Sequence, residues 1–347
     1  LLTTSLRRED VQNRIRHLLA QLFRDIPTGV GSHGAIPNLT VPDLNRILSE
    51  GVSRAVEMGY GTTADIPHIE ERGCIPDADP KQVSERAKQR GQKQIGTLGS
   101  GNHFLEIDYV DELYNHHAAG RLNLSLGQIV IIIHTGSRGL GYQVCDDNLK
   151  TTIRAAERYG IELPDRQLAC APLKSSEGKA YLGAMRAAAN FAFVNRQVIM
   201  HLTEQAFLKA LGLKPHELRM RLIYDICHNI AKFEEHEIDG EKRKVCVHRK
   251  GATRSFGPGS LELPAEYRDI GQPVMVPGDM GRYSYLCIGT EKAMTETFGS
   301  SCHGAGRMMS RKKSSKVSRQ MNMIEELRKR GVEIMARGKR TIAEEMP

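Results

Sequence analysis

The sequence predicts a mixed α+β protein in which central β-sheets are flanked by helices. The 347 residues are 40% hydrophobic and 26% charged, which is typical of a globular chain with a large core. Stretches with helical spacing of apolar residues alternate with short β-branched runs. No repeat, linker or break in composition divides the chain, so we expect one domain over residues 1–347.

The N-terminal part is expected to be mainly helical. Apolar residues recur at helical spacing over 7–24. Residues 41–59 predict a second helix, and Pro42 suits its first turn. The segment 61–82 is rich in turn residues, and the basic segment that begins at residue 81 predicts a short helix to residue 90.

Strands and long helices alternate in the middle of the chain. A strand is predicted over 103–110, and the β-branched run 129–133 predicts a buried strand. Helical patterns follow over 141–159 and 177–211. A further extended apolar run covers 222–227, so we expect a strand to end there.

The last third is expected to be rich in strands and then helical. Short apolar runs bounded by turn residues predict the strands, and helical spacing predicts the helices. The expected strands are 244–248, 273–276 and 283–289, and the expected helices are 291–297, 303–312 and 320–330.

Charge and cysteine content limit the classes of protein to consider. The formal net charge is +8, which fits a polyanionic partner or a phosphate-rich substrate and equally fits a basic surface without such a role. Seven cysteines without a CxxC pair favour a reducing cytoplasm over a disulfide scaffold. No apolar run approaches the roughly 20 residues that a membrane-spanning helix needs.

Four histidines occupy positions that suit chemistry. His134 and His228 each follow an apolar run, whereas His103 and His303 lie in segments that contain glycine. Imidazoles at strand ends can gather around a ligand, bind a metal or act as nucleophiles. The alternative for each is a buried histidine or a capped turn that only supports the fold. Cys302 is a rival nucleophile, because the expected helix start beside it would lower the pKa of its thiol.

Several basic segments are candidates for binding phosphate. Arg138 follows His134 among glycines and hydroxyls, which favours an anion-binding nest. The segment 248–254 is basic and fits either phosphate or a solvated hairpin. Residues 307–319 are basic without an acid and fit a nucleic-acid backbone or an exposed helix face. His236 lies among glutamates and is interpreted as a surface residue.

Five segments together resemble the RtcB family of RNA ligases. They read GSGNHFLE over 99–106, HTGSRGLG over 134–141, HNIAK over 228–232, VHRKGATR over 247–254 and SCHGAGR over 301–307. The resemblance covers nearly the whole chain and implies an RtcB-like fold with a metal at the floor of a cleft. It also implies a ligase that joins 2′,3′-cyclic-phosphate or 3′-phosphate RNA ends to 5′-hydroxyl ends, in tRNA splicing or RNA repair.

The resemblance assigns roles to particular residues. GTP and manganese would be required, with two manganese ions in the full-length protein, and His303 would carry GMP covalently. The implied manganese ligands are His103, His134 and His228. Arg138 and Arg311 would contact RNA phosphates. The implied nucleotide-binding residues are Asn102, His103, Phe104, Leu105, Glu106, His228, Asn229, Pro277, Gly278, Asp279, Met280, Ser284, Gly304, Ala305 and Gly306.

The chain also departs from the family pattern. The family's Asp-x-Gly/Asn-Cys-Gly motif, which completes the metal site, is absent, and the flanks of Gly73 and Cys74 do not match it. The family's C-terminal lysine is also absent, and Asp279 stands where many relatives have serine. We therefore expect a fragment clipped at both ends that binds metal weakly and ligates poorly.

Two other functions remain open from the sequence. One is a metal-dependent cyclic phosphodiesterase, which would need the metal site but not His303. The other is a catalytically impaired RNA-binding fragment, which would keep the basic surface only. If the ligase assignment holds, the resemblance adds archease, a small activating protein, as a partner beside the RNA substrate.

Overall fold

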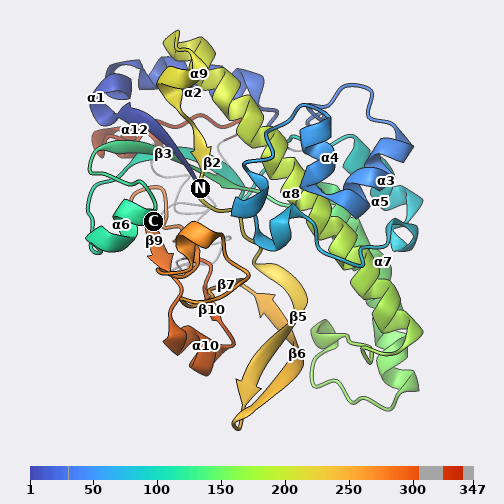
Figure 1. The fold of residues 1–347 in the computed structure, drawn as a ribbon. Helices are drawn as coiled ribbons and strands as arrows, with labels where there is room; N and C mark the ends of the chain where they lie inside the picture. The colour runs from blue at the N-terminus through green and yellow to red at the C-terminus, as the bar shows by residue number, and fades with distance from the viewer. Residues whose placement is uncertain (30, 305–322, 339–347) are drawn as a thin grey trace.

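The structure is a computed structural model that describes residues 1–29, 31–304 and 323–338. Helices surround several small antiparallel sheets, so the predicted mixed α+β class is confirmed (Figure 1). Among the described helices, none combines the length and the apolar character needed to cross a bilayer.

The longest helix, α8 (Ser176–Leu211), organises the core. The Ser175 hydroxyl accepts a hydrogen bond from Gly178 N and caps its start, and Gly212 ends it with φ 69°. The rings of Phe191 and Phe207 are fully buried along it. Because the sequence carries a capping residue at the start, a glycine at the end and an apolar pattern between them, the helix agrees with the predicted range 177–211 to within one residue.

Three other helices pack against α8 and bury their apolar sides there (Figure 1). They are α2 (Ile15–Asp25), α3 (Val41–Glu50) and α7 (Arg138–Arg158). The shorter helices are α1 (Arg8–Val11), α4 (Val52–Glu57), α5 (Glu85–Gln92), α6 (His116–Arg121), α9 (Pro215–Leu218), α10 (Glu291–Thr297) and α12 (Met323–Lys329). Single 3₁₀ turns cover Gln12–Arg14, Ile66–His68, Glu70–Gly73, Pro80–Gln82, Arg166–Leu168 and Ala265–Tyr267.

The largest sheet has four antiparallel strands in the order β2-β3-β1-β4. Its strands are β1 (Leu2–Arg7), β2 (Phe104–Tyr109), β3 (Gln128–His134) and β4 (Arg221–Leu222). Phe104 pairs with His134, so the first residue of β2 lies beside the last residue of β3. This register brings the segment that contains His103 next to His134.

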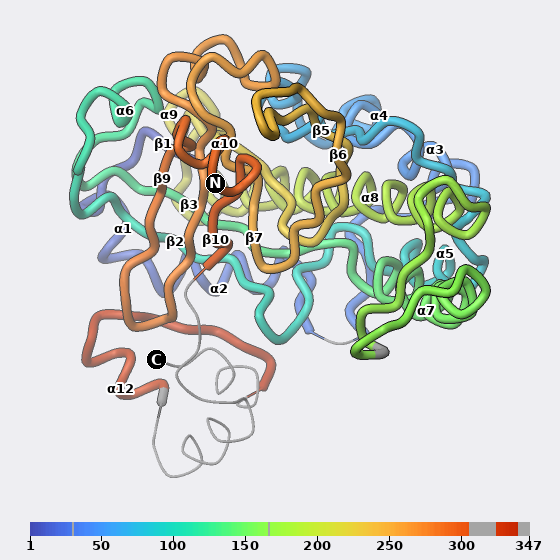
Figure 2. Tube along the Cα trace, turned by 90° about the horizontal axis from the view of Figure 1, so that it is seen from below, coloured from blue at the N-terminus to red at the C-terminus, as the bar shows by residue number. Residues whose placement is uncertain are grey.

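Three two-stranded antiparallel ribbons complete the described strands. The β5–β6 hairpin projects from the body of the molecule in Figure 1, and Figure 2 shows β7 and β10 beside its base. The pairs are β5 (Asn229–Ile238) with β6 (Glu241–Lys250), β7 (Ala252–Arg254) with β10 (Ser300–Cys302), and β8 (Pro273–Val276) with β9 (Tyr285–Ile288).

Some predicted elements need correction. The helix expected over 41–59 is two helices separated by Gly51, whose φ is 60° and whose missing side chain makes room for the Gly73 carbonyl. The run 222–227 is a strand only at its first residue, so His228 precedes β5 rather than ending a strand. Residues 303–304 are not helical, and the rest of the helix expected to residue 312 lies outside the described residues.

Candidate functional site

Four histidines that are distant in sequence meet in the fold. The ring centroids of His134 and His228 are 5.2 Å apart, and those of His228 and His303 are 4.6 Å apart. His134 lies 6.3 Å from His103 and 6.4 Å from His303 by the same measure. The fold thus brings the four imidazoles that the sequence singled out into one cluster.

Different backbone contacts hold each of these histidines. The pairing of Phe104 with His134 fixes the first two, and the pairing of Cys302 with Ala252 places the residue before His303. Ahead of His228, the Cys227 amide donates to the buried Glu70 carboxylate at 2.7 Å. The cluster is therefore built by long-range pairing between elements that lie far apart along the chain.

The cluster faces a cavity of about 770 Å³. Predicted site residues that line it are Asn102, His103, His134, Arg138, His228, Asn229, Pro277 and His303. Further polar lining residues include Arg196, Asp225 and Cys227, and also His248, Arg249 and Lys250 from the basic segment 248–254. A cavity with convergent imidazoles and cations suits an anionic ligand.

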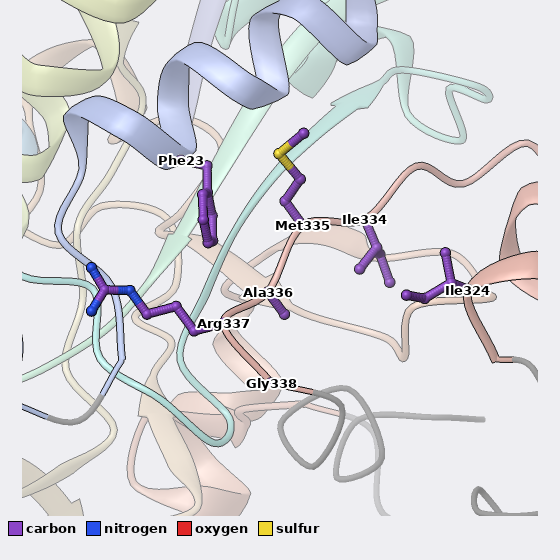
Figure 3. A pocket seen from close by; sticks show the side chains of 7 residues that line it. All are labelled: Phe23, Ile324, Ile334, Met335, Ala336, Arg337 and Gly338. Atoms are coloured by element: carbon purple, nitrogen blue, oxygen red, sulfur yellow. The ribbon is translucent and has the colours of Figure 1, made fainter.

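A second cavity, of about 340 Å³, lies elsewhere. Figure 3 shows the ring of Phe23 and the side chains of Ile334 and Met335 around it, with Arg337 at its side. Its lining holds one charged group and no histidine, cysteine or carboxylate. It therefore has fewer groups that could bind a metal or act in catalysis than the histidine cavity has.

Burial keeps the clustered histidines neutral. Loss of water and then the positive charge of Arg138 lower the pKa of His103 to about 4. Burial and the neighbouring histidines lower the pKa of His134 to about 4 and that of His228 to about 3. The pKa of His303 is also lowered, by burial and then by Lys250. Near pH 7 each ring is neutral and has one nitrogen lone pair, as a metal ligand or nucleophile requires. In His103 this lone pair accepts a hydrogen bond from Arg138.

The donor groups fit part of a divalent cation site. His134 Nδ1 is buried and has no hydrogen-bond partner among the described residues, as expected for a nitrogen that serves a ligand. His103 Nδ1 lies 3.0 Å from the Arg138 guanidinium, which donates to it. Over the ranges that the structure describes, no three His, Cys, Asp or Glu side chains complete a metal site. The imidazoles would thus need further oxygen or thiolate ligands.

Arg138 is a half-buried cation whose contacts are neutral groups. Its Nε donates to Thr97 Oγ1 at 3.1 Å, and burial lowers the pKa of the guanidinium. Within the described ranges no carboxylate pairs with it. The guanidinium also lies against Gly99, where any side chain would collide with it. A half-buried guanidinium at the cavity wall without a carboxylate partner among the described residues favours a phosphate ligand.

The remaining predicted residues lie around this cavity or beyond it. The Phe104 ring packs edge-on against His134 at 5.2 Å, while Leu105 packs against the main core. The Asp279 carboxylate accepts from Gly281 N in its own turn. Met280 and Gly304 do not line the cavity. Ala305, Gly306 and Arg311 lie outside the described residues.

Two other sequence interpretations have outcomes in the structure. His236 is only 4% exposed, so its interpretation as a surface residue is wrong. Its Nε2 lies 3.0 Å from Glu234, and this pairing explains why a polar ring can be buried there. Cys74 contacts the Ser49 carbonyl and does not line the histidine cavity, which agrees with rejecting Gly73 and Cys74 as a substitute metal motif. Cys302, the rival nucleophile, is exposed and does not line the cavity either.

Two buried carboxyl groups lie close together on β2. Burial and then the neighbouring Asp108 raise the pKa of Glu106 to about 8, and burial raises the pKa of Asp108 to about 6. Ser284 Oγ donates to Glu106 at 3.3 Å and accepts from Gly278 N at 3.1 Å. A protonated Glu106 at neutral pH both donates and accepts hydrogen bonds.

This pair predicts a pH effect on stability. A folded-state pKa that is raised contributes stability below the unfolded pKa, and the contribution is lost as pH rises through the folded value. The wild type should therefore lose stability as pH rises through about 8. Glu106→Gln should reduce this loss, as measured by urea unfolding at pH 6 and pH 9. Equal losses in both proteins would contradict the assignment, and the exposed Glu112→Gln serves as the control.

The fold and site define a mixed α+β protein with a basic cavity that is lined by clustered, neutral histidines. A family profile described as tRNA-splicing ligase RtcB matches residues 1–347. The chain therefore belongs to the RtcB family, which confirms the resemblance seen in its five motifs.

Individual relatives agree over the full chain. A tRNA-splicing ligase RtcB of Archaeoglobus fulgidus is 50% identical over 347 residues, which are 100% of this chain and 72% of that protein. The protein of the same name from Methanococcus maripaludis is 51% identical with the same coverage. That of Thermococcus kodakarensis is 48% identical, again over 100% of this chain and 72% of the relative.

Proposed function

We propose that this protein is an RNA ligase that joins 3′-phosphate or 2′,3′-cyclic-phosphate ends to 5′-hydroxyl ends through a GMP-linked His303. Family membership over the full chain supports ligation of RNA. The observation that carries the nucleotide chemistry is the position of His303. Its ring lies 4.6 Å from His228 at the edge of a basic cavity large enough for a nucleotide.

The chemistry follows from a neutral imidazole. A ring nitrogen of His303 attacks the α-phosphorus of GTP, a P–N bond forms, and pyrophosphate leaves with the electrons of the broken P–O bond. A 2′,3′-cyclic phosphate must first be opened by water to a 3′-phosphate. An oxygen of the RNA 3′-phosphate then attacks the GMP phosphorus, and the P–N bond breaks to return the imidazole. Attack by the 5′-hydroxyl on this activated phosphorus forms the new phosphodiester and releases GMP. A lowered pKa of His303 favours the first step because the neutral ring is the nucleophile.

Other residues would bind and orient the phosphates. We assign His103, His134 and His228 as the imidazole ligands of manganese, which when bound neutralises phosphate charge and orients the attack. Arg138 and Lys250 would hold anionic oxygens, since both line the cavity. Asn102 and Asn229 would hydrogen-bond the nucleotide from two sides of the histidine cluster. Ser284 and Glu106 are hydrogen-bonded to each other and are assigned to the guanine end.

The direct test is covalent labelling. We expect the purified protein, incubated with α-labelled GTP and manganese, to become labelled through a bond that is acid-labile and alkali-stable, as a phosphoramidate is. Label from β- or γ-labelled GTP should not be retained, because pyrophosphate leaves. Absence of α-label under these conditions would refute the GMP-linked mechanism. Sealing of an RNA with the stated ends, measured with and without archease, tests the ligation steps separately.

A further inference from the structure

A tight turn directly precedes the strand that delivers His303. Phe298 has φ 51° and Gly299 has φ 57°, both in the left-handed region. The Gly299 position lies against the Phe256 ring and Met294, so a side chain there would collide. The three residues of β10 then lead to His303. The position of the His303 backbone therefore depends on how firmly this turn is held.

One guanidinium binds the whole turn. Arg249 Nη2 donates to the Phe298 carbonyl at 2.9 Å and to the Gly299 carbonyl at 3.3 Å. Its Nε donates to Ser300 Oγ at 2.9 Å. Arg249 is only 3% exposed, so these hydrogen bonds are shielded from water. Three successive residues before Cys302 and His303 are thus fixed by a single side chain of β6.

A second residue fixes the guanidinium itself. Glu234 on β5 accepts from Arg249 Nη1 at 2.6 Å and from Nη2 at 2.8 Å, which is a bidentate pair. His236 lies 3.0 Å from the same carboxylate, and its ring packs edge-on against Phe298 at 5.3 Å. One face of the β5–β6 hairpin, from Arg249 at its base to His236 near its tip, therefore contacts the turn through both polar and apolar groups.

The energetics favour a geometric role for this pair. A buried ion pair adds little net stability, because loss of hydration offsets much of the attraction. What it supplies is a fixed geometry, and small displacements of a reacting group cost rate steeply. β10 pairs with β7 over three residues only, so the hydrogen bonds between these two strands hold β10 weakly.

We propose that Arg249, oriented by Glu234, is a positioning residue that sets the His303 imidazole for attack on the nucleotide. This inference rests on the proposed role of His303 as the nucleophile. Arg249 acts through the 298–300 turn and β10, and it is not itself assigned a contact with the α-phosphorus. The hairpin base and the nucleophile strand then move as one unit.

The test compares Arg249→Lys with the wild type in single-turnover GMP transfer to the protein. Lysine keeps the charge beside Glu234 but cannot reach both carbonyls and Ser300 Oγ together. We expect the rate constant at saturating GTP to fall about tenfold or more. The GTP concentration for half-maximal rate and the fraction of protein labelled should change by less than about twofold, since a displaced nucleophile slows the attack rather than binding. A purely structural role would instead lower the labelled fraction and leave the rate constant unchanged.

Matched variants complete the design. Arg243→Lys is the control, because Arg243 lies on the same strand and its pair with Glu241 is exposed. Ser300→Ala removes one of the contacts without a charge change and should give a smaller loss of rate, which keeps the proposal testable if Arg249→Lys does not fold. A rate constant within about twofold of wild type in both Arg249→Lys and Ser300→Ala would overturn the inference.

A second measurement separates this inference from the proposed function. Diethyl pyrocarbonate modifies exposed imidazoles, and mass spectrometry can follow His303 without GTP. Arg249→Lys should speed modification of His303 because the strand is less firmly held, while Arg243→Lys should not. If the wild type takes no label from GTP, the proposed function fails, and the modification rates still decide whether Arg249 positions His303.

Discussion

His303→Ala is expected to abolish transfer of GMP from GTP to the protein. The variant lacks the nitrogen that forms the P–N bond, and loss of a nucleophile lowers rate by about three orders of magnitude or more. Stability should change little, because His303 is half-buried at the cavity edge and follows a short strand. The measurement is α-labelled GTP retained on the protein, together with sealing of an RNA that has 3′-phosphate and 5′-hydroxyl ends.

The control for this substitution is His216→Ala, which removes an exposed histidine of α9 far from the cavity lining. Label retained by His303→Ala would contradict the assignment and would direct attention to another nucleophile. A variant that no longer seals RNA but still opens cyclic phosphates would favour the phosphodiesterase alternative. A protein that binds RNA equally well after changes at His103, His134 and His228, and that never seals RNA, would be a binding fragment.

Lys232→Met is expected to destabilise the protein by about 3–5 kcal/mol, because it leaves a buried carboxylate without its main counter-charge. Lys232 Nζ lies 2.7 Å from Glu70 Oε1 and 2.7 Å from Glu71 Oε1. Glu70 is 0% exposed and also accepts from Cys227 N. The free energy of unfolding in urea measures the loss. Because Glu70 holds the backbone before His228, the histidine cavity should loosen as well.

Two controls test the electrostatic reason. Lys329→Met removes an exposed pair with Glu326 and should leave the free energy of unfolding almost unchanged. Glu70→Gln combined with Lys232→Met removes both charges and should recover part of the loss. A double variant no more stable than Lys232→Met would show that packing, rather than the unpaired charge, dominates.

The pair of Glu70 with Lys232 also predicts the direction in which stability changes with pH. Burial alone would raise the pKa of Glu70, but Lys232 and Arg254 outweigh it and lower the pKa from 4.5 to about 2. A lowered folded-state pKa contributes stability above the unfolded value, and this is lost as pH falls through the folded value. The wild type should therefore lose stability between about pH 4.5 and 2, and the double variant should lose less.

Strong local signals explain which parts of the fold could be predicted. Helix α8 has a capping serine, a long apolar pattern and a terminal glycine, and β3 has an unbroken β-branched run. β10 is three small polar residues, and its conformation follows from pairing with β7 and from Arg249. The spacing of residues in the sequence does not indicate such tertiary contacts, so this strand was not predicted.

The candidate site shows the same division. The histidines stand out because each follows an apolar run or lies in a segment that contains glycine, and because a family motif includes each of them. Glu70 and Arg249 contact the backbone that precedes His228 and His303, respectively. Their partners lie far away in the chain, as Cys227 does from Glu70. Nothing local distinguishes Glu70 from other charged residues. Arg249 lies in the basic segment 248–254, for which the sequence indicated phosphate binding or a solvated hairpin and not contact with a turn. His236 was misjudged for this reason, since its ring packs against Phe256 and Phe298, which lie far from it in the chain.

The pairing of Phe104 with His134 limits how this chain can change over evolutionary time. Side chains of a strand alternate between faces, so deleting or inserting one residue within β3 would turn the terminal imidazole to the opposite face. The connection between β2 and β3, residues 110–127, carries no such restriction, because its length does not alter the alternation within either strand. Insertions and deletions among descendants are therefore expected mainly in that connection, while the length of β3 stays at seven residues.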